Sequence, residues 1–170
     1  MSYCSICPRI TNCIPPHGPR PAKYFAIGEA PGQTEDRTGI PFSGQTGEEW
    51  NNTYLPLAGL SRSEIFVTNT RQCRPHQNRK PSPEEIEICG NHHLPSELDS
   101  VTPTVIFLMG ATACSLSPDI DLEVEHGIPR RGKLFGKEYW IVPMFHPALG
   151  LHDTGKMTPI LEDWAKLEMW

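Results

Sequence analysis

Four cysteines stand at a spacing that suits metal chemistry. Cys4 and Cys7 form a Cys-x-x-Cys pair, and Cys73 and Cys89 follow as single residues sixteen positions apart. Four thiolates arranged in this way suit zinc or an iron–sulfur cluster, and the spacing alone favours neither. The alternatives are three disulfides, which the total of six cysteines permits, or scattered buried thiols, which the apolar surroundings of Cys114 suggest for that residue.

A glycine-rich segment, GEAPG at 28–32, offers a second kind of chemistry. Its glycines let backbone N–H groups approach a phosphate or an oxyanion. The segment lacks the Gly-Lys-Ser/Thr ending of a Walker loop, and Pro31 stands where the helix of a dinucleotide fingerprint would begin. It indicates either an anion-binding loop or a simple tight turn after a strand.

The elements that must position these residues follow from short apolar runs. Such runs predict buried strands over 23–27, 65–68, 104–109 and 139–145. Helices are predicted over 47–60, over 82–98 with Ser82 as N-cap, from 110, and over 158–169. Residues 28–47 and 70–82 are predicted as loops, and 118–137 as irregular. This alternation predicts an α/β fold with a mainly parallel four-stranded sheet and helices on both faces.

Three of the predicted strands end in polar residues. Glu29 follows the first strand, Asn69 the second and His146 the last. Because parallel strands present their carboxyl ends at one edge, and ligands bind beyond that edge, the three side chains are expected to meet there.

Composition limits the class of protein. The 170 residues fit one domain, and a net charge of −5 disfavours a protein that coats nucleic acid by bulk charge. The N-terminus has no apolar segment typical of a secretory signal, and no apolar run is long enough to cross a bilayer. We therefore expect a cytoplasmic protein without a membrane partner, and a monomer.

Three segments together resemble the signatures of family 4 uracil-DNA glycosylases. They are GEAPGQTEDRTGIPFSGQTG (28–47), TNTRQCRPHQNRKPSPEEIEIC (68–89) and PMFHPALGL (143–151), and MGATA (109–113), RRG (130–132) and CSIC near the N-terminus also fit. The resemblance implies one uracil-DNA-glycosylase-like domain over 1–170 with a three-layer α/β/α sandwich. It also implies a cluster-binding N-terminal loop over 1–22 and a [4Fe–4S] cluster on Cys4, Cys7, Cys73 and Cys89.

The resemblance also implies a pocket for a pyrimidine base flipped out of DNA. Phe42 would stack on the base, and the Asn69 amide would recognise its N3–H and O4. His146 and backbone N–H groups of 28–32 would stabilise negative charge at O2, and Glu29 or Glu35 would position or deprotonate a water. The implied catalytic residues are thus Glu29, Glu35 and His146, and the implied base-binding residues are Gly28, Glu29, Phe42, Asn69 and His146.

DNA contacts are expected from two local basic patches, in the loop 70–80 and near 130–137. The candidate DNA-binding residues are Arg71, Arg74, Asn78, Arg79 and Arg131. Lys80, at the far end of its loop, is the only lysine in the three signatures, so no Schiff-base nucleophile is expected and the enzyme should be a monofunctional glycosylase.

The sequence departs from the family after His146-Pro147. Where the family continues with a serine and a leucine–arginine pair that wedges into the duplex, this chain has ALGLHD. Uracil is the expected base, with Glu35 as the candidate block against C5 substituents. One alternative is a C5-modified pyrimidine in bacteriophage DNA, such as glucosylated hydroxymethylcytosine, removed in anti-phage defence. The other is an inactive nucleic-acid-binding or iron–sulfur sensing protein.

Overall fold

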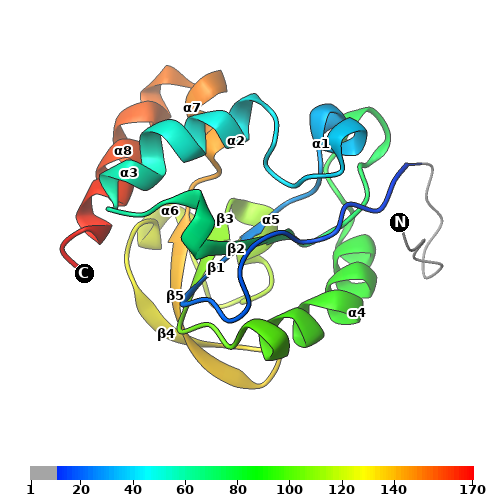
Figure 1. The fold of residues 1–170 in the computed structure, drawn as a ribbon. Coiled ribbons are helices and arrows are strands. Elements are labelled where there is room, and N and C mark those ends of the chain that lie inside the picture. The colour runs from blue at the N-terminus through cyan, green and yellow to red at the C-terminus, as the bar shows by residue number, and fades with distance from the viewer. Residues whose placement is uncertain (1–10) are drawn as a thin grey trace.

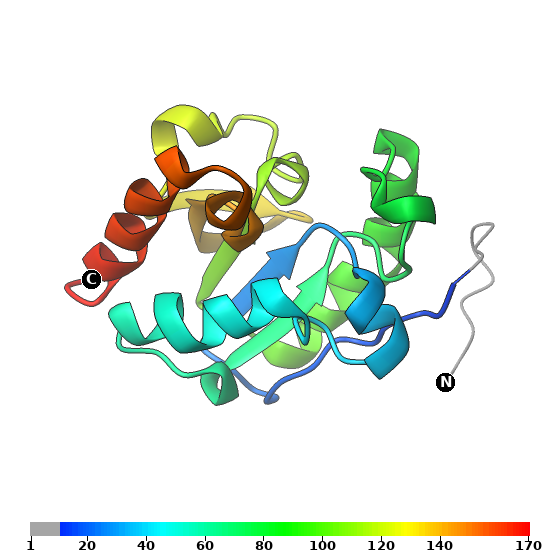
Figure 2. The same ribbon diagram turned by 90° about the horizontal axis from the view of Figure 1, so that it is seen from above.

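One sheet of five strands lies at the centre of the molecule, in the order β2-β1-β3-β5-β4. Figure 1 shows this computed structural model, which describes residues 11–170. Four strands run parallel, and their apolar, largely β-branched and aromatic residues are almost wholly buried. These strands are β1 (Tyr24–Gly28), β2 (Ile65–Asn69), β3 (Val105–Met109) and β5 (Lys137–Met144). The arrowheads of β1 and β2 point to the same edge in Figure 2.

The fifth strand corrects the prediction of a four-stranded sheet. β4 (Arg130–Leu134) pairs antiparallel with β5, inside the segment that we predicted as irregular. Its sequence is Arg-Arg-Gly-Lys-Leu, and its residues alternate between greater and lesser exposure before the buried Leu134. A polar edge strand of this kind carries no apolar run that would predict it.

Helices on one face of the sheet cover its larger core. Gln45–Leu57 is one helical segment, built from α2 (Gln45–Glu49), a π-helical turn η1 (Trp50–Tyr54) and α3 (Leu55–Leu57). It packs beside α8 (Thr154–Leu167), which follows α7 (Pro147–His152). Trp50, Tyr54 and Trp164 are completely buried between these helices and the sheet.

The opposite face is covered by α4 (Pro83–Val101) and α5 (Ala111–Cys114). Figure 1 shows α4 on the other side of the sheet from α2, α3 and α8, which confirms the three-layer α/β/α sandwich. The Ser82 hydroxyl caps α4 by accepting the Glu85 N–H, as predicted. Shorter helices lie in the connections: α1 (Gln33–Thr38), η2 (Arg62–Glu64), η3 (His76–Asn78) and α6 (Leu122–Glu125). Within residues 11–170, no helix has the length and apolar character that crossing a membrane requires.

Residues 13–17, here called the N-terminal strap, run along the outer edge of β2. His17 and Val67 exchange two backbone hydrogen bonds of 2.9 and 2.8 Å, and the Ile14 N–H donates to the Gln72 carbonyl. The backbone of Cys13 pairs with that of Cys73 in an isolated antiparallel β-bridge. The strap therefore satisfies backbone groups that an edge strand would otherwise leave open.

Candidate active site

A cavity of about 160 Å³ lies where β1, β2 and β5 end. It is lined by Ala30, Gly32, Glu35, Phe42, Thr46, Asn69 and His146. Four of these were predicted as site residues, and they come from four separate parts of the chain. The edge expected from the strand order is therefore where the structure brings Glu35, Phe42, Asn69 and His146 together.

Gly28 allows Phe42 and Asn69 to approach each other. It is the last residue of β1 and lies in register with Asn69 on β2. A Cβ at this position would lie 2.6 Å from both the Phe42 ring and Asn69 Oδ1, closer than packed atoms allow. The glycine thus contributes space to the cavity wall, and Phe42 itself has a positive φ of 55° at its turn.

His146 is held in one orientation at the start of α7. Its Nδ1 accepts the Ala148 N–H at 3.2 Å, which assigns the ring proton of the neutral imidazole to Nε2. Its ring lies 6.1 Å from the Phe42 ring, nearly parallel to it. Burial lowers the pKa of His146 below 6.5, although the carboxylates of Glu29 and Glu35 oppose this. The site thus holds a neutral imidazole that donates through Nε2.

The Glu35 carboxylate cross-links two parts of the loop beside the cavity. Its two oxygens accept the N–H groups of Gly32 and Gly44, at 3.1 and 3.0 Å. The side chain therefore holds together the segments before and after α1. The sequence did not reveal this structural role of Glu35.

Glu29 lies outside the cavity lining and is held differently. The buried Thr112 hydroxyl donates to Glu29 Oε2, and the Glu29 carbonyl accepts the Thr70 hydroxyl at 2.6 Å. Within residues 11–170, Oε1 has no hydrogen-bond partner. The two glutamates that the sequence could not distinguish thus differ. Each oxygen of Glu35 accepts a backbone N–H, whereas Glu29 Oε1 accepts no hydrogen bond within residues 11–170.

The predicted DNA-binding residues do not form one surface. Arg71 is only 4% exposed, and its guanidinium forms a 2.6 Å ion pair with Glu85. Arg79 binds both oxygens of the same carboxylate. Arg74 and Asn78 remain on the outside of the loop, joined by a 2.7 Å hydrogen bond. The buried Arg71 therefore supports the loop rather than presenting its charge to phosphates.

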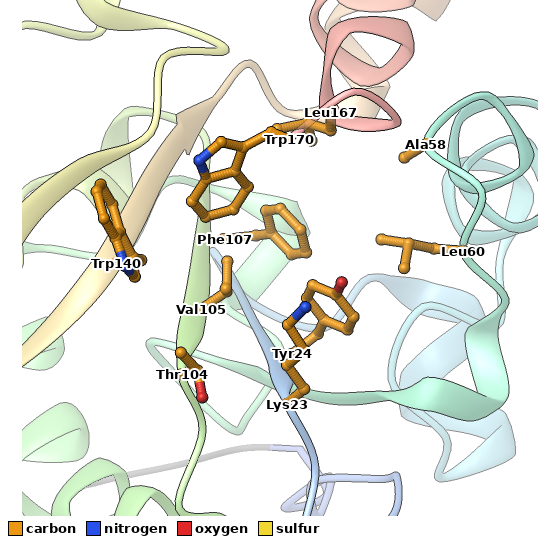
Figure 3. Close-up of a pocket in the computed structure, with 10 residues that line it drawn as sticks. All are labelled: Lys23, Tyr24, Ala58, Leu60, Thr104, Val105, Phe107, Trp140, Leu167 and Trp170. Atoms are coloured by element: carbon orange, nitrogen blue, oxygen red, sulfur yellow. The ribbon is translucent and has the colours of Figure 1, made fainter.

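Arg131 lies at the opposite end of the sheet. It pairs with Trp140, which is in register with Val105 and Tyr24 at the beginnings of β3 and β1. A second cavity, of about 320 Å³, opens at this end, and Figure 3 shows Trp140 and Tyr24 among its walls. Its lining is mainly apolar and includes none of the predicted site residues.

The described cysteines fit a thiolate-bound group. Cys73 and Cys89 are both buried, and Cys89 Sγ accepts the Gln72 N–H at 3.4 Å. Burial alone would lower the pKa of His93, but its hydrogen bonds to Cys89 and Glu97 raise it to about 9. His93 is thus hydrogen-bonded to Cys89, one of the four expected ligands.

Cys4 and Cys7 lie outside the described residues. Thr11, where the described chain begins, donates through its hydroxyl to the Arg74 carbonyl at 2.9 Å, so the first described residue lies next to the loop that carries Cys73. Residues 11–170 on their own contain no group of three or more potential metal ligands. The described part of the chain thus supplies two of the four expected ligands.

Comparison with known proteins places this geometry in a family. The family model described as "Uracil DNA glycosylase superfamily" matches residues 15–170. The Type-4 uracil-DNA glycosylase of Archaeoglobus fulgidus is 36% identical over 148 residues, which cover 84% of this chain and 73% of that protein. Those of Saccharolobus solfataricus (32% over 163 residues; 92% and 75%) and Thermotoga maritima (35% over 154 residues; 87% and 78%) are similar to a comparable extent.

Proposed function

The chain belongs to the uracil DNA glycosylase superfamily, and we propose that it excises uracil from DNA by hydrolysing the N-glycosidic bond. The observation that carries this proposal is the cavity in which Phe42, Asn69 and His146 meet. Its relatives from A. fulgidus and S. solfataricus, named uracil-DNA glycosylases, support the same base.

The cavity suits one flipped-out pyrimidine. Its volume of about 160 Å³ is below the roughly 300 Å³ at which pockets for drug-sized ligands begin. Phe42 offers a ring for stacking, and the buried Asn69 amide offers one donor and one acceptor to the base edge. A base that carries a hexose at C5 is much larger than uracil and would extend beyond a cavity of this volume. The size of the cavity therefore favours uracil over a glucosylated cytosine.

Bond cleavage leaves negative charge on the base. As the bond between C1′ and the base breaks, its electron pair leaves with the base, and the His146 Nε2–H donates to the developing O2 anion. Glu29 positions the water that adds to C1′ and takes its proton, since both oxygens of Glu35 already bind backbone N–H groups. None of the described residues that line the cavity is a lysine, which supports a monofunctional reaction that ends at an abasic site.

The cysteines would hold the cofactor away from this chemistry. We propose that Cys4, Cys7, Cys73 and Cys89 ligate a [4Fe–4S] cluster, whose contribution when bound is a cross-link between the N-terminal segment and the loop 70–80. That loop carries three predicted DNA contacts on its outer side, Arg74, Asn78 and the exposed Arg79. The cluster would thereby stabilise a DNA-binding loop.

The direct test is release of the base from otherwise identical strands. Oligonucleotides would carry uracil, thymine, cytosine, hydroxymethylcytosine or its glucosylated form, with strand cleavage scored before and after alkali. We expect cleavage only with uracil and only after alkali, and loss of activity in Asn69→Ala and Glu29→Gln. Release of the glucosylated base with uracil untouched would show that the proposed substrate is wrong. Inactivity on all five strands would show that the proposed glycosylase function is wrong.

A further inference from the structure

Thr112 occupies a buried position directly behind Glu29. Its side chain is 2% exposed, and its hydroxyl donates to Glu29 Oε2. The residue lies in the first turn of α5, on the side of the sheet opposite to α2 and α8. A hydroxyl so placed fixes the rotamer of the carboxylate that it binds, because a freely rotating carboxylate would lose this bond.

The same turn is also packed against His146. Gly110, just before α5, has a φ of 92°, and a Cβ there would lie 3.1 Å from the His146 Cβ. The Gly110 N–H donates to the Met144 carbonyl at 2.7 Å, and the Ser115 hydroxyl donates to the Thr112 carbonyl at 2.6 Å. The turn therefore sets the position of Glu29 relative to His146.

The main chain of Glu29 is fixed from the other side. Its carbonyl accepts the Thr70 hydroxyl at 2.6 Å and the Arg71 N–H at 3.1 Å, both from the segment that follows β2. With its carbonyl held by Thr70 and Arg71 and its Oε2 held by Thr112, Glu29 has one carboxylate oxygen, Oε1, left for a ligand.

We propose that Thr112 is a positioning residue that acts through Glu29, leaving Oε1 as the oxygen that binds the attacking water. This role rests on the proposed function. In the reaction, the water oxygen bonds to C1′, the electron pair of the broken glycosidic bond leaves with the base, and the water proton passes to Glu29. Without the Thr112 hydroxyl, the carboxylate would rotate and spend less time in the orientation that takes this proton.

The kinetic test compares three variants by single-turnover release of uracil. Thr112→Val removes the hydroxyl and keeps the shape, and should lower the rate at saturating DNA about tenfold to a hundredfold, with DNA affinity nearly unchanged. Thr112→Ser restores the donor and should recover the rate to within about threefold. Thr68→Val is the matched control, because Thr68 is equally buried but its hydroxyl has no partner within residues 11–170.

A wild-type rate in Thr112→Val, or equal losses in Thr112→Val and Thr68→Val, would overturn the proposal. So would failure of Thr112→Ser to recover the rate, provided that its thermal unfolding matches that of the wild type. A loss of DNA affinity with an unchanged rate would equally contradict positioning, since it would indicate a role in binding.

A second readout does not depend on activity. A hydroxyl proton buried in a hydrogen bond to a carboxylate exchanges slowly, so Thr112 should give a protected hydroxyl signal in NMR spectra that Glu29→Ala abolishes. Absence of this signal in the folded wild type would overturn the proposal even if uracil is released. A protected signal in a protein that releases no base would show that the contact exists and that the proposed function, with the role resting on it, is wrong.

Discussion

Glu85→Gln should destabilise the protein, because the Glu85 carboxylate pairs with two arginines. The Glu85 carboxylate forms a 2.6 Å ion pair with Arg71, and it accepts hydrogen bonds from Arg79 through both oxygens and from the Ser82 N–H at 2.9 Å. Arg71 is nearly buried, whereas the Glu85 side chain is 23% exposed. The substitution removes the negative charge and leaves a buried guanidinium without an ionic partner.

The magnitude follows from the pKa of Glu85. Hydrogen bonding to Arg79, followed by the Ser82 N–H and the charge of Arg71, lowers it from 4.5 to about 2 against the opposing effect of burial. At about 1.4 kcal/mol per pH unit, that difference is about 3 kcal/mol. Solvent screening on the exposed side of Glu85 reduces this value, so we expect Glu85→Gln to lower the free energy of unfolding by about 2 kcal/mol at pH 7.

The sign of the pH dependence is fixed by the lowered pKa. The stabilisation by Glu85 is fully present above its unfolded pKa of 4.5 and disappears as the pH falls through about 2. Urea unfolding of the wild type and Glu85→Gln should therefore differ at pH 7 and converge between pH 4.5 and 2.

Glu84→Gln is the matched control, because Glu84 lies in the same helical turn but is exposed and forms no ion pair within the described chain. Equal unfolding free energies of the two variants at pH 7 would refute this reasoning. A difference between Glu85→Gln and the wild type that persists at pH 2 would refute its electrostatic basis.

Three further outcomes are expected. Gly47→Ala should lower the unfolding free energy by at least about 2 kcal/mol, measured by urea unfolding, because its Cβ would overlap the Phe42 carbonyl. Cys73→Ser should lose bound iron when purified anaerobically, whereas Cys114→Ser should keep the wild-type iron content. The rate of base release should fall on acidification only below pH 6.5, since burial lowers the pKa of His146 and its neutral form is the donor; a fall that begins above pH 6.5 would contradict this assignment.

The central strands and the edge that holds the cavity were predictable from the sequence. Apolar runs predicted β1, β2, β3 and β5 to within a few residues, because these strands are buried on both faces. β4 escaped prediction because it is a polar edge strand, defined by its pairing with β5. The prediction that these strands run parallel was enough to place Asn69 and His146 at the same edge of the sheet.

The candidate DNA contacts were less predictable, because charge in a sequence does not show which cations are already paired. Arg71 and Arg79 both bind Glu85, and that carboxylate follows them on the next helix. Arg131 was predicted as a DNA contact from the basic patch around it, and the sequence did not show that β4 places it at the opposite end of the sheet from the cavity. Thr112 gave a weak signal as a single polar residue in an apolar segment, MGATA, directly after a predicted strand.

The N-terminal strap has a consequence for self-association. The two edges of the sheet are protected by different means. β4 carries the exposed Arg131 and Lys133, whereas the outer side of the apolar β2 is covered, within residues 11–170, by the strap. A chain cut after residue 17 would present an unpaired strand that another copy can extend. Loss of residues 13–17 should therefore promote self-association through this edge.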